Sequence, residues 1–308
     1  MNRTSPDPIT AMPSAVPSPT LSYDAALRRV AALAAHEATL PLNPVAHSFA
    51  LNHGTSTERC FLLVHGYTNC PQQFRAFGEL LHARGHNVYV PRLPHHGLAD
   101  RFTPEQGQLN RAELLGYLDD ALAVAGGLGA RVSVIGISAG AVLAAYAAQH
   151  RPQVEMAMPI APMLGTPSIP AWATWPLATL GQVLPNRFRW WDPEHKDSRR
   201  SPPHCYPRYA TRVLATMTAL GLEVLRDAAR QPPRARSIVV VLNEADEAIT
   251  NPPVERLAAR WHAHGTPVHV YWFPRERQLI HDCIDPAQEL QQVDYVYPIL
   301  LELAEYGW

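Results

Sequence analysis

Residues 131–150 read RVSVIGISAGAVLAAYAAQH, and this stretch constrains the fold more than any other in the chain. Residues 132–135 form an apolar run that predicts a buried strand of a parallel sheet, because such strands are covered on both faces. The pentapeptide GISAG, with Ser138 at its centre, ends the run, and an alanine-rich helical segment follows at 141–150. A sharp strand-to-helix turn crowds the backbone, which explains a glycine on each side of the serine. The pattern predicts an exposed Ser138 hydroxyl beside the free N–H groups of a helix N-terminus.

Segments with strand and helix patterns alternate along the rest of the chain. Apolar or alternating runs predict strands at 47–51, 60–64, 87–90, 154–160, 237–242 and 268–273. Apolar residues at helical spacing predict helices at 23–40, 71–84, 111–125, 254–264 and 295–306. This alternation predicts an α/β fold, with a mostly parallel central sheet and helices on both of its faces.

One segment, residues 161–208, breaks the alternation. It contains Trp172, Trp175, Trp190 and many prolines, and it is too long for a plain connection. We expect an inserted cap over the sheet edge, whose three tryptophans are candidate substrate-binding residues; a surface excursion with its own small core is the alternative. The predicted organisation is a disordered Pro- and Ser-rich tail at 1–20, a core at 21–160 and 209–308, and the cap at 161–208.

The composition argues against several classes of function. A formal net charge of −1 gives no sign of a nucleic-acid footprint or of attraction to an anionic membrane. No apolar run approaches the ~20 residues that cross a bilayer, so no membrane insertion is expected, and the N-terminus lacks the apolar centre of a secretory signal. The four cysteines show neither metal-binding spacing nor a disulfide framework, which favours reduced thiols in a cytoplasmic protein; a Cys205–Cys283 bridge is the alternative.

A serine hydroxyl is a poor nucleophile at neutral pH unless a base, and a group that orients the base, lie beside it. His281 follows the last predicted strand, in the loop RERQLIHDCIDP, and is the candidate base. Asp246 follows the strand before it and is the candidate orienting acid, with Glu244 and Glu247 as alternatives. Because the carboxyl ends of parallel strands meet at one edge of the sheet, Ser138, Asp246 and His281 are predicted to converge as a catalytic triad.

The loop after the 60–64 strand supplies candidates for stabilising a developing negative charge. Such an oxyanion hole needs two converging backbone N–H groups. Ala139, the residue after the candidate nucleophile, provides one, and Tyr67 in the loop HGYTN provides the other. Gly66 is expected to let the backbone approach the substrate, so His65 and Gly66 are candidate substrate-binding residues; an ordinary strand-ending turn is the alternative.

The segments FLLVHGYTNCPQQF, PRLPHHGLAD, VIGISAG and LNEADEAI, with the His281 loop, resemble the α/β-hydrolase superfamily, and in particular its carboxylesterase and monoacylglycerol-lipase-like branch. The resemblance spans about residues 45–305. It implies an α/β-hydrolase fold, a triad in the chain order Ser138, Asp246, His281, and an oxyanion hole in an HG-aromatic-T loop. Asn243 stands where that branch usually has glycine in the acid turn, and Ala139 stands where methionine or leucine is common.

The expected activity is that of a serine carboxylesterase, which cleaves short- to medium-chain carboxylic esters through an acyl-enzyme intermediate. Amidase, thioesterase, carbon–carbon bond hydrolase or lipase-type activity on the same triad remains open. A non-catalytic binding protein on the same scaffold is the alternative from another class. The expected partner is a small-molecule ester, no metal or cofactor is implied, and the oligomeric state is not readable from the sequence.

Overall fold

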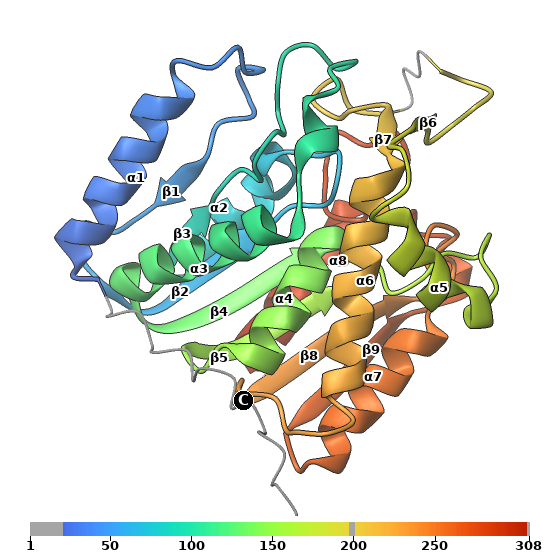
Figure 1. Cartoon of the computed structure of the whole chain (residues 1–308). Helices are drawn as coiled ribbons and strands as arrows, with labels where there is room; N and C mark the ends of the chain where they lie inside the picture. Colours follow the sequence, from blue (N-terminus) through green and yellow to red (C-terminus); the bar gives the residue numbers. More distant parts are fainter. Residues whose placement is uncertain (1–20, 197–200, 307–308) are drawn as a thin grey trace, which may run out of the picture.

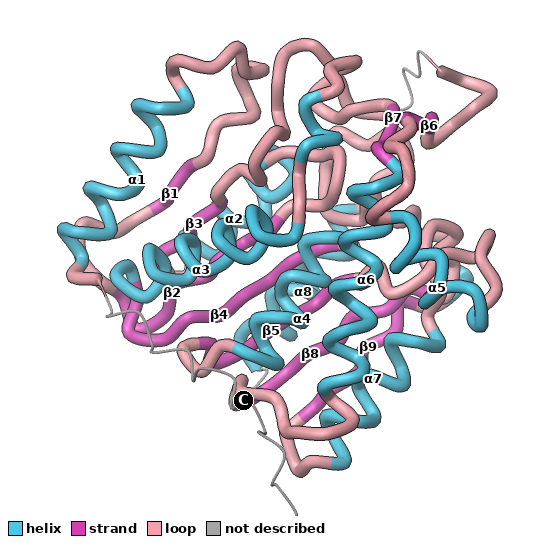
Figure 2. The backbone as a smooth tube through the Cα atoms, in the orientation of Figure 1, coloured by secondary structure: helices cyan, strands magenta, loops and turns pink. Residues whose placement is uncertain are grey.

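The computed structural model describes residues 21–196 and 201–306, so the tail predicted at 1–20 lies outside the described residues. The strands are β1 Phe49–Leu51, β2 Thr57–Val64, β3 Asn87–Val90, β4 Gly129–Ile137, β5 Val154–Ile160, β6 Phe188–Trp190, β7 Arg208–Ala210, β8 Ser237–Asn243 and β9 Val268–Phe273. The helices are α1 Tyr23–Glu37, α2 Arg75–Ala83, α3 Arg111–Leu128, α4 Ala139–His150, α5 Ala171–Gly181, α6 Thr211–Asp227, α7 Pro252–Ala263 and α8 Val293–Tyr306. Short 3-10 helices lie at η1 Pro71–Phe74, η2 Glu105–Gln108 and η3 Arg275–Arg277. Figure 2 follows these elements along the backbone.

Seven of the strands form one sheet in the order β1-β3-β2-β4-β5-β8-β9. β1 pairs antiparallel with β3, and every other neighbouring pair is parallel. The carboxyl ends of the parallel strands therefore meet at one edge of the sheet, where ligand sites of open α/β sheets form. This is the mostly parallel sheet that the alternating pattern predicts.

Helices cover both faces of this sheet. In Figure 1, α3, α4, α6 and α7 lie in front of the sheet, and α2 and α8 lie behind it. Behind the sheet, the rings of Phe77 in α2 and Tyr297 in α8 lie 5.5 Å apart. β2, β4, β5 and β8 are almost entirely buried between the two helical layers, which explains why the sequence shows them as continuous apolar runs.

Local sequence signals explain where most helices begin. The predicted 71–84 helix begins as η1, because Pro71 fixes its first residue, and it continues as α2. α3 begins after Asn110, whose side chain accepts from the Glu113 N–H at 3.1 Å while the Glu113 carboxylate accepts from the Asn110 N–H at 3.1 Å. This reciprocal capping box satisfies two N–H groups at the helix start. α6 is a helix beyond those predicted above, although Val213, Met217, Leu220 and Val224 recur at helical spacing on its buried face.

Residues 161–208 leave the sheet after β5 and include α5 and β6. β6 pairs antiparallel with β7, which begins where this segment ends, and the two form a separate two-stranded sheet. Figure 1 places it on the side toward which the parallel strands point. All four cysteines are buried and free, so Cys205 and Cys283 are not bridged. Among the described helices, none has both the length and the hydropathy to span a bilayer.

Candidate active site

Ser138 lies at a strained turn between β4 and α4. Its φ of 57° and ψ of −114° lie outside the usual regions for L-residues, a conformation that costs on the order of 1–3 kcal/mol. Two backbone hydrogen bonds hold the turn: the Ser138 N–H donates to Ile160 O of β5 at 2.9 Å, and Ser138 O accepts from the Met163 N–H at 3.3 Å. The Ser138 side chain makes no capping hydrogen bond to the N–H groups at the start of α4.

Packing of the turn requires both glycines of the pentapeptide. A Cβ on Gly136 would overlap the carbonyl oxygen of Gly140, and a Cβ on Gly140 would overlap the carbonyl oxygen of Val64 in β2. Both obstacles are main-chain atoms, which cannot rotate away, so the prediction that glycine is needed on each side of the serine is confirmed. Gly66 differs, because a Cβ there would make an ordinary contact of 3.6 Å with Gln73.

His281 and Asp246 form a direct contact of 2.7 Å between Nδ1 and Oδ2. Asp246 follows β8, and its buried side chain accepts further hydrogen bonds at Oδ1 from the N–H groups of Ala248 at 2.8 Å and Ile249 at 3.2 Å. These bonds fix the carboxylate and leave Oδ2 for the imidazole. Glu244 instead accepts a hydrogen bond from the Arg275 N–H at 3.1 Å, so Asp246 is the acid that contacts His281.

Burial and pairing act in opposite directions on the pKa values of these two groups. Burial by itself lowers the pKa of His281, but the charge of Asp246 and its hydrogen bond outweigh burial and raise that pKa above its usual value. Burial by itself raises the pKa of Asp246, but the charge of His281 and the hydrogen bonds that the carboxylate accepts lower it below its usual value. Asp246 is therefore ionised at neutral pH and stabilises the protonated form of the imidazole.

A cavity of about 200 Å³ lies at the carboxyl edge of the sheet, and Ser138 and His281 both line it. One part of its wall is apolar and consists of Ile137, Met163, Leu214, Ala248 and Ile249. Another part is polar and consists of Thr68, Asn69, Gln73, Asp282 and Gln288. Trp191, Cys205 and Tyr206 line it from the long segment between β5 and β7. The cavity thus combines an apolar wall, a polar wall and a serine at a strained turn.

The loop after β2 borders the same cavity. Thr68 adopts a φ of 67°, and its hydroxyl accepts a hydrogen bond from Trp191 Nε1 at 2.9 Å. The Tyr67 hydroxyl accepts one from the Ala210 N–H at 3.0 Å, so the 161–208 segment and its flank hold this loop at two points. Ala139 is the first residue of α4, where N–H groups have no acceptor within the helix. Of the predicted oxyanion residues, Tyr67 lines the cavity together with Ser138, and Ala139 follows Ser138 directly in the chain.

His65 does not line the cavity, contrary to its predicted substrate contact. Its ring is buried; Nδ1 donates to Gly66 O at 2.9 Å, and Nε2 accepts from the Leu93 N–H at 3.0 Å. Burial, reinforced by the neighbouring His96, lowers the pKa of His65 well below its usual value, so the ring is neutral and can accept that bond. His65 therefore stabilises the loop through these two hydrogen bonds, whereas Gly66 lines the cavity, as predicted.

The structure does not bring the three predicted tryptophans to the cavity. Trp172 and Trp175 on α5 are 81% and 64% exposed, because α5 packs through its small residues. The Trp190 ring lies 5.9 Å from Phe102 and is also absent from the cavity wall. The sequence analysis missed Trp191 as a lining residue. Two adjacent residues of an extended segment point to opposite sides, and composition alone could not tell which of the pair faces inward.

Comparison with known proteins shows the family of the chain. The model of the alpha/beta hydrolase family matches residues 61–282, which is most of the chain. The chain belongs to this family. A thermostable monoacylglycerol lipase from Bacillus sp. (strain H-257) is 31% identical over 117 residues, which covers 37% of this chain and 44% of the relative. The match to that curated relative thus spans less than half of its length.

Solved structures match the fold of this hydrolase over most of its length. A monoacylglycerol lipase from Paleococcus ferrophilus has a TM-score of 0.63 and 17% identity, covering 85% of this chain and 100% of that one. A metagenome-derived lipolytic enzyme, from work on LipS and LipT, has a TM-score of 0.63 and 17% identity, covering 86% and 99%. A soluble variant of monoglyceride lipase from Saccharomyces cerevisiae has a TM-score of 0.61 and 12% identity, covering 84% and 90%. These likenesses confirm the predicted α/β-hydrolase fold.

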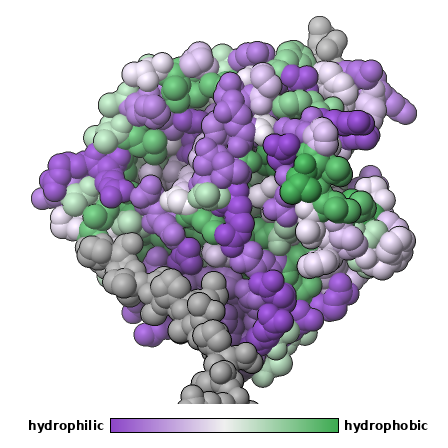
Figure 3. All heavy atoms as spheres, in the orientation of Figure 1, coloured by the Kyte–Doolittle hydropathy of each residue, from purple (hydrophilic) through white to green (hydrophobic). Residues whose placement is uncertain are grey.

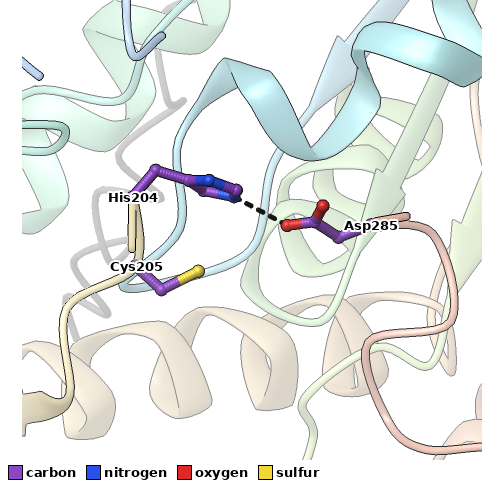
Figure 4. Close-up of side chains that lie close together, drawn as sticks. All are labelled: His204, Cys205 and Asp285. Atoms are coloured by element: carbon purple, nitrogen blue, oxygen red, sulfur yellow. Dashed lines mark hydrogen bonds and ion pairs between the residues drawn. The ribbon is translucent and has the colours of Figure 1, made fainter. Parts of the chain in front are cut away.

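A buried polar cluster lies beside the cavity that Ser138 lines, where the 161–208 segment returns to the core. Figure 4 shows the imidazole of His204 and the carboxylate of Asp285 facing each other, with the Cys205 thiol beside them. Their donor atoms lie within 4.8 Å of one another, so the three residues could hold a metal ion. The His204 Nε2 to Asp285 Oδ2 distance is 2.7 Å, whereas two ligands on one tetrahedral zinc ion lie roughly 3.4 Å apart, given bonds of about 2.1 Å. The geometry is that of a direct hydrogen bond between the two side chains.

A second and larger cavity of about 800 Å³ lies between α1, α3 and the loop after β3. Tyr89 and Tyr117 contribute aromatic walls, and charged groups of both signs line it. Its described lining contains no serine, threonine, cysteine or lysine. The smaller cavity at Ser138 is therefore the candidate site for chemistry in this hydrolase.

Proposed function

We propose that the chain is a serine carboxylesterase that uses Ser138 as nucleophile, His281 as general base and acid, and Asp246 as the orienting carboxylate. The observation that carries the proposal is the 2.7 Å contact between His281 and Asp246 beside the cavity that Ser138 lines. A base held by a fixed carboxylate near a strained, uncapped serine is the arrangement needed to activate a hydroxyl.

In the proposed reaction, Ser138 Oγ attacks the ester carbonyl carbon while His281 Nε2 takes the hydroxyl proton. A C–O bond forms, the carbonyl electrons move to oxygen, and the tetrahedral intermediate carries one negative charge. The intermediate then collapses, and the departing alkoxide takes the proton from His281. Water attacks the acyl-enzyme in the same way, with His281 again accepting and returning a proton, which releases the acid and restores Ser138. Asp246 stays ionised throughout and stabilises the imidazolium.

The backbone N–H groups of Tyr67 and Ala139 are the proposed donors to the oxyanion. Ala139 begins α4, so the helix dipole adds to the stabilisation of negative charge at this point. The hydrogen bonds from Trp191 and Ala210 to the Thr68 and Tyr67 side chains support the loop that carries the second donor. Loss of one such donor typically lowers turnover on the order of 10²–10³-fold.

The size and the lining of the cavity favour esters with short to medium acyl chains as substrates. A volume of about 200 Å³ leaves room for a small acyl group, and Ile137, Met163 and Leu214 offer it an apolar wall. We propose that residues 161–208 act as a cap on this cavity, because Trp191 and Tyr206 close one side of it. Cleavage of thioesters or amides on the same triad is tested by hydrolysis of thioester and anilide versions of one acyl group.

A second candidate activity is hydrolysis of monoacylglycerols. The 31% identical Bacillus relative is a monoacylglycerol lipase, and the polar wall with Asn69 and Gln288 offers hydrogen bonds to a hydroxylated alcohol group. A direct comparison of kcat/KM for p-nitrophenyl butyrate, monobutyrin and monolaurin separates the two activities.

The decisive experiment compares Ser138→Ala with wild type, using p-nitrophenyl butyrate and a fluorophosphonate probe. We expect turnover to fall on the order of 10⁴–10⁶-fold and covalent labelling to disappear. Ser168→Ala is the matched control, because Ser168 is exposed and its hydroxyl contacts only Thr166, at 3.1 Å. A wild-type protein that neither turns over esters nor takes the probe would instead be a binding protein on the hydrolase scaffold.

A further inference from the structure

An apolar surface projects from the hydrolase on and just after α5. Six of the eleven large hydrophobic side chains that are exposed in the described part of the chain lie here. We call this set the α5 surface: Trp172 81% exposed, Trp175 64%, Leu177 47%, Leu180 53%, Val183 77% and Leu184 54%. Figure 3 shows green, hydrophobic side chains gathered over the region of α5. An exposed cluster of this kind on a globular protein marks a surface that contacts another apolar phase.

An ordinary surface helix buries its large apolar side chains, whereas α5 buries small side chains and exposes its large apolar ones. Its buried residues are the small Ala173, Thr174 and Ala178, and a Cβ on Gly181 would crowd Ala215 of α6. Small residues thus allow close packing of α5 on α6, while the large apolar side chains point to solvent. Rotation of the helix cannot bury them, because the interface with α6 has no room for a tryptophan.

The charged residues nearest to the α5 surface on its C-terminal side in the sequence are Arg187 and Arg189, and the acidic residues Asp192 and Glu194 follow them. Residues 161–191 contain no aspartate or glutamate, and no charged residue of any kind occurs from 166 to 186. Arg187 and Arg189 follow the α5 surface directly, and Arg212 at the start of α6 donates to Leu184 O at 3.1 Å, inside the surface. All three arginines are exposed. The net charge of −1 for the whole chain therefore does not reveal that exposed arginines lie beside this apolar surface. We call Arg187, Arg189 and Arg212 the rim.

From this arrangement we infer that the α5 surface docks on an anionic phospholipid bilayer. Tryptophan side chains are favoured at the headgroup level, aliphatic side chains reach the acyl boundary, and arginines at the rim meet lipid phosphates. The 11 residues of α5 extend about 16 Å, so the helix lies on the bilayer and does not cross it.

A second copy of the chain fits the α5 surface less well. In a two-fold symmetric dimer the same patch meets itself, so the rim of Arg187, Arg189 and Arg212 would face an identical rim. The surface contains no acidic residue to pair with those charges. A layer of lipid phosphates supplies the opposite charge on all sides.

Docking at the α5 surface brings the active-site cavity close to the bilayer. Met163 and Thr166, in the segment that leads into α5, line the cavity, and so does Leu214 of α6, on which α5 packs. An amphiphilic ester leaving the membrane would therefore travel a short path to Ser138. The docking itself is independent of the proposed esterase activity, since it is measured by lipid binding.

The test is cosedimentation of the full chain with sucrose-loaded vesicles, either pure phosphatidylcholine or 3:1 phosphatidylcholine and phosphatidylglycerol. We expect binding to the anionic vesicles, at least tenfold weaker partition for the Trp172→Ala/Trp175→Ala variant, and loss of the anionic preference for Arg187→Gln/Arg189→Gln. Leu290→Ala is the matched control, because Leu290 is 67% exposed and lies outside the α5 surface. The same variants should retain wild-type turnover of a water-soluble ester.

Wild-type protein provides a second readout that needs no substitution. Tryptophan emission should shift to shorter wavelength on adding anionic vesicles and be quenched by lipids with brominated acyl chains. Absence of binding at millimolar lipid, or an equal loss in Leu290→Ala, overturns the proposal. So does a stable dimer, measured by light scattering, that Trp172→Asp converts to a monomer.

Discussion

His204 and Asp285 form a buried hydrogen-bonded pair, with 2.7 Å between Nε2 and Oδ2 and with 4% and 1% of their side chains exposed. The pair, drawn in Figure 4, links the 161–208 segment to the loop between η3 and α8, which also carries His281. The neighbouring Asp282 accepts a hydrogen bond from Asn69 Nδ2 at 3.1 Å, which ties the same loop to the loop after β2. The candidate base is therefore held from two directions by contacts outside the triad.

Removing one partner of this pair should destabilise the fold strongly. His204→Gln or Asp285→Asn removes a buried hydrogen bond and leaves a buried polar group without its partner, and we expect the free energy of unfolding to fall by about 1–3 kcal/mol. Urea denaturation followed by tryptophan fluorescence measures the change. Asp120→Asn is the control, because Asp120 pairs with Arg29 on the surface, with 75% of its side chain exposed. Similar losses in the control and the buried variants would contradict a special role for the buried pair.

The His281–Asp246 pair predicts the acid limb of the pH–rate profile. The reaction needs neutral His281, and its pKa is raised, so kcat/KM should fall with decreasing pH through a value above the usual ~6.5 of histidine. In Asp246→Asn the group that raises this pKa is gone. The acid limb should move to lower pH, and kcat should fall on the order of 10⁴-fold. An unchanged acid limb in this variant would show that Asp246 does not set the titration.

The same pair predicts how stability depends on pH. His281 has a raised folded pKa, so its contribution is complete below about pH 6.5 and is lost as pH rises through the folded value. Asp246 has a lowered folded pKa, so its contribution is complete above about pH 3.9 and is lost as pH falls through the folded value. The pair should stabilise the fold most between those limits. The difference in unfolding free energy between wild type and Asp246→Asn, measured from pH 3 to 9, should peak there.

Gly140→Ala should prevent the Ser138 turn from forming. Its Cβ would overlap the Val64 carbonyl of β2, so strand and helix cannot both keep their places. We expect loss of activity together with a large drop in thermal stability. Gly116→Ala is the matched control, because Gly116 lies on the exposed side of α3 and a Cβ there would meet no neighbouring group within 4 Å. This variant should raise the free energy of unfolding by roughly 0.5–1 kcal/mol. A folded, active Gly140→Ala protein would show that the turn tolerates a side chain.

Trp191→Ala should weaken the active site, whereas Trp190→Ala should not. Trp191 lines the cavity and donates to Thr68, so its loss widens the site and frees the loop that carries the proposed oxyanion donor. We expect kcat/KM for p-nitrophenyl butyrate to fall about tenfold or more. Trp190 packs on Phe102 outside the cavity, so its variant should stay within about twofold of wild type. The reverse order would place the wrong residue of the pair at the site.

The sequence by itself determined the strands of the central sheet, most of the helices that cover it, the Ser138 turn and a set of candidate residues for chemistry there. These are local properties: apolar runs specify buried strands, and a serine between two glycines specifies a turn that other residues cannot adopt. The contact between Asp246 and His281 is explained in the same way, because the carboxyl ends of parallel strands meet at one edge of the sheet, whereas the catalytic roles of the two residues stay a prediction.

Tertiary structure alone decided which side chains form the walls of the cavity. Trp172, Trp175 and Trp190 were reasonable candidates by composition, yet the close packing of α5 on α6 turns the first two to solvent. His65 lies in the loop that borders the cavity, but its ring is buried and accepts a hydrogen bond from the Leu93 N–H. The direction of a side chain depends on what its helix or strand packs against, and those partners lie far away in the sequence.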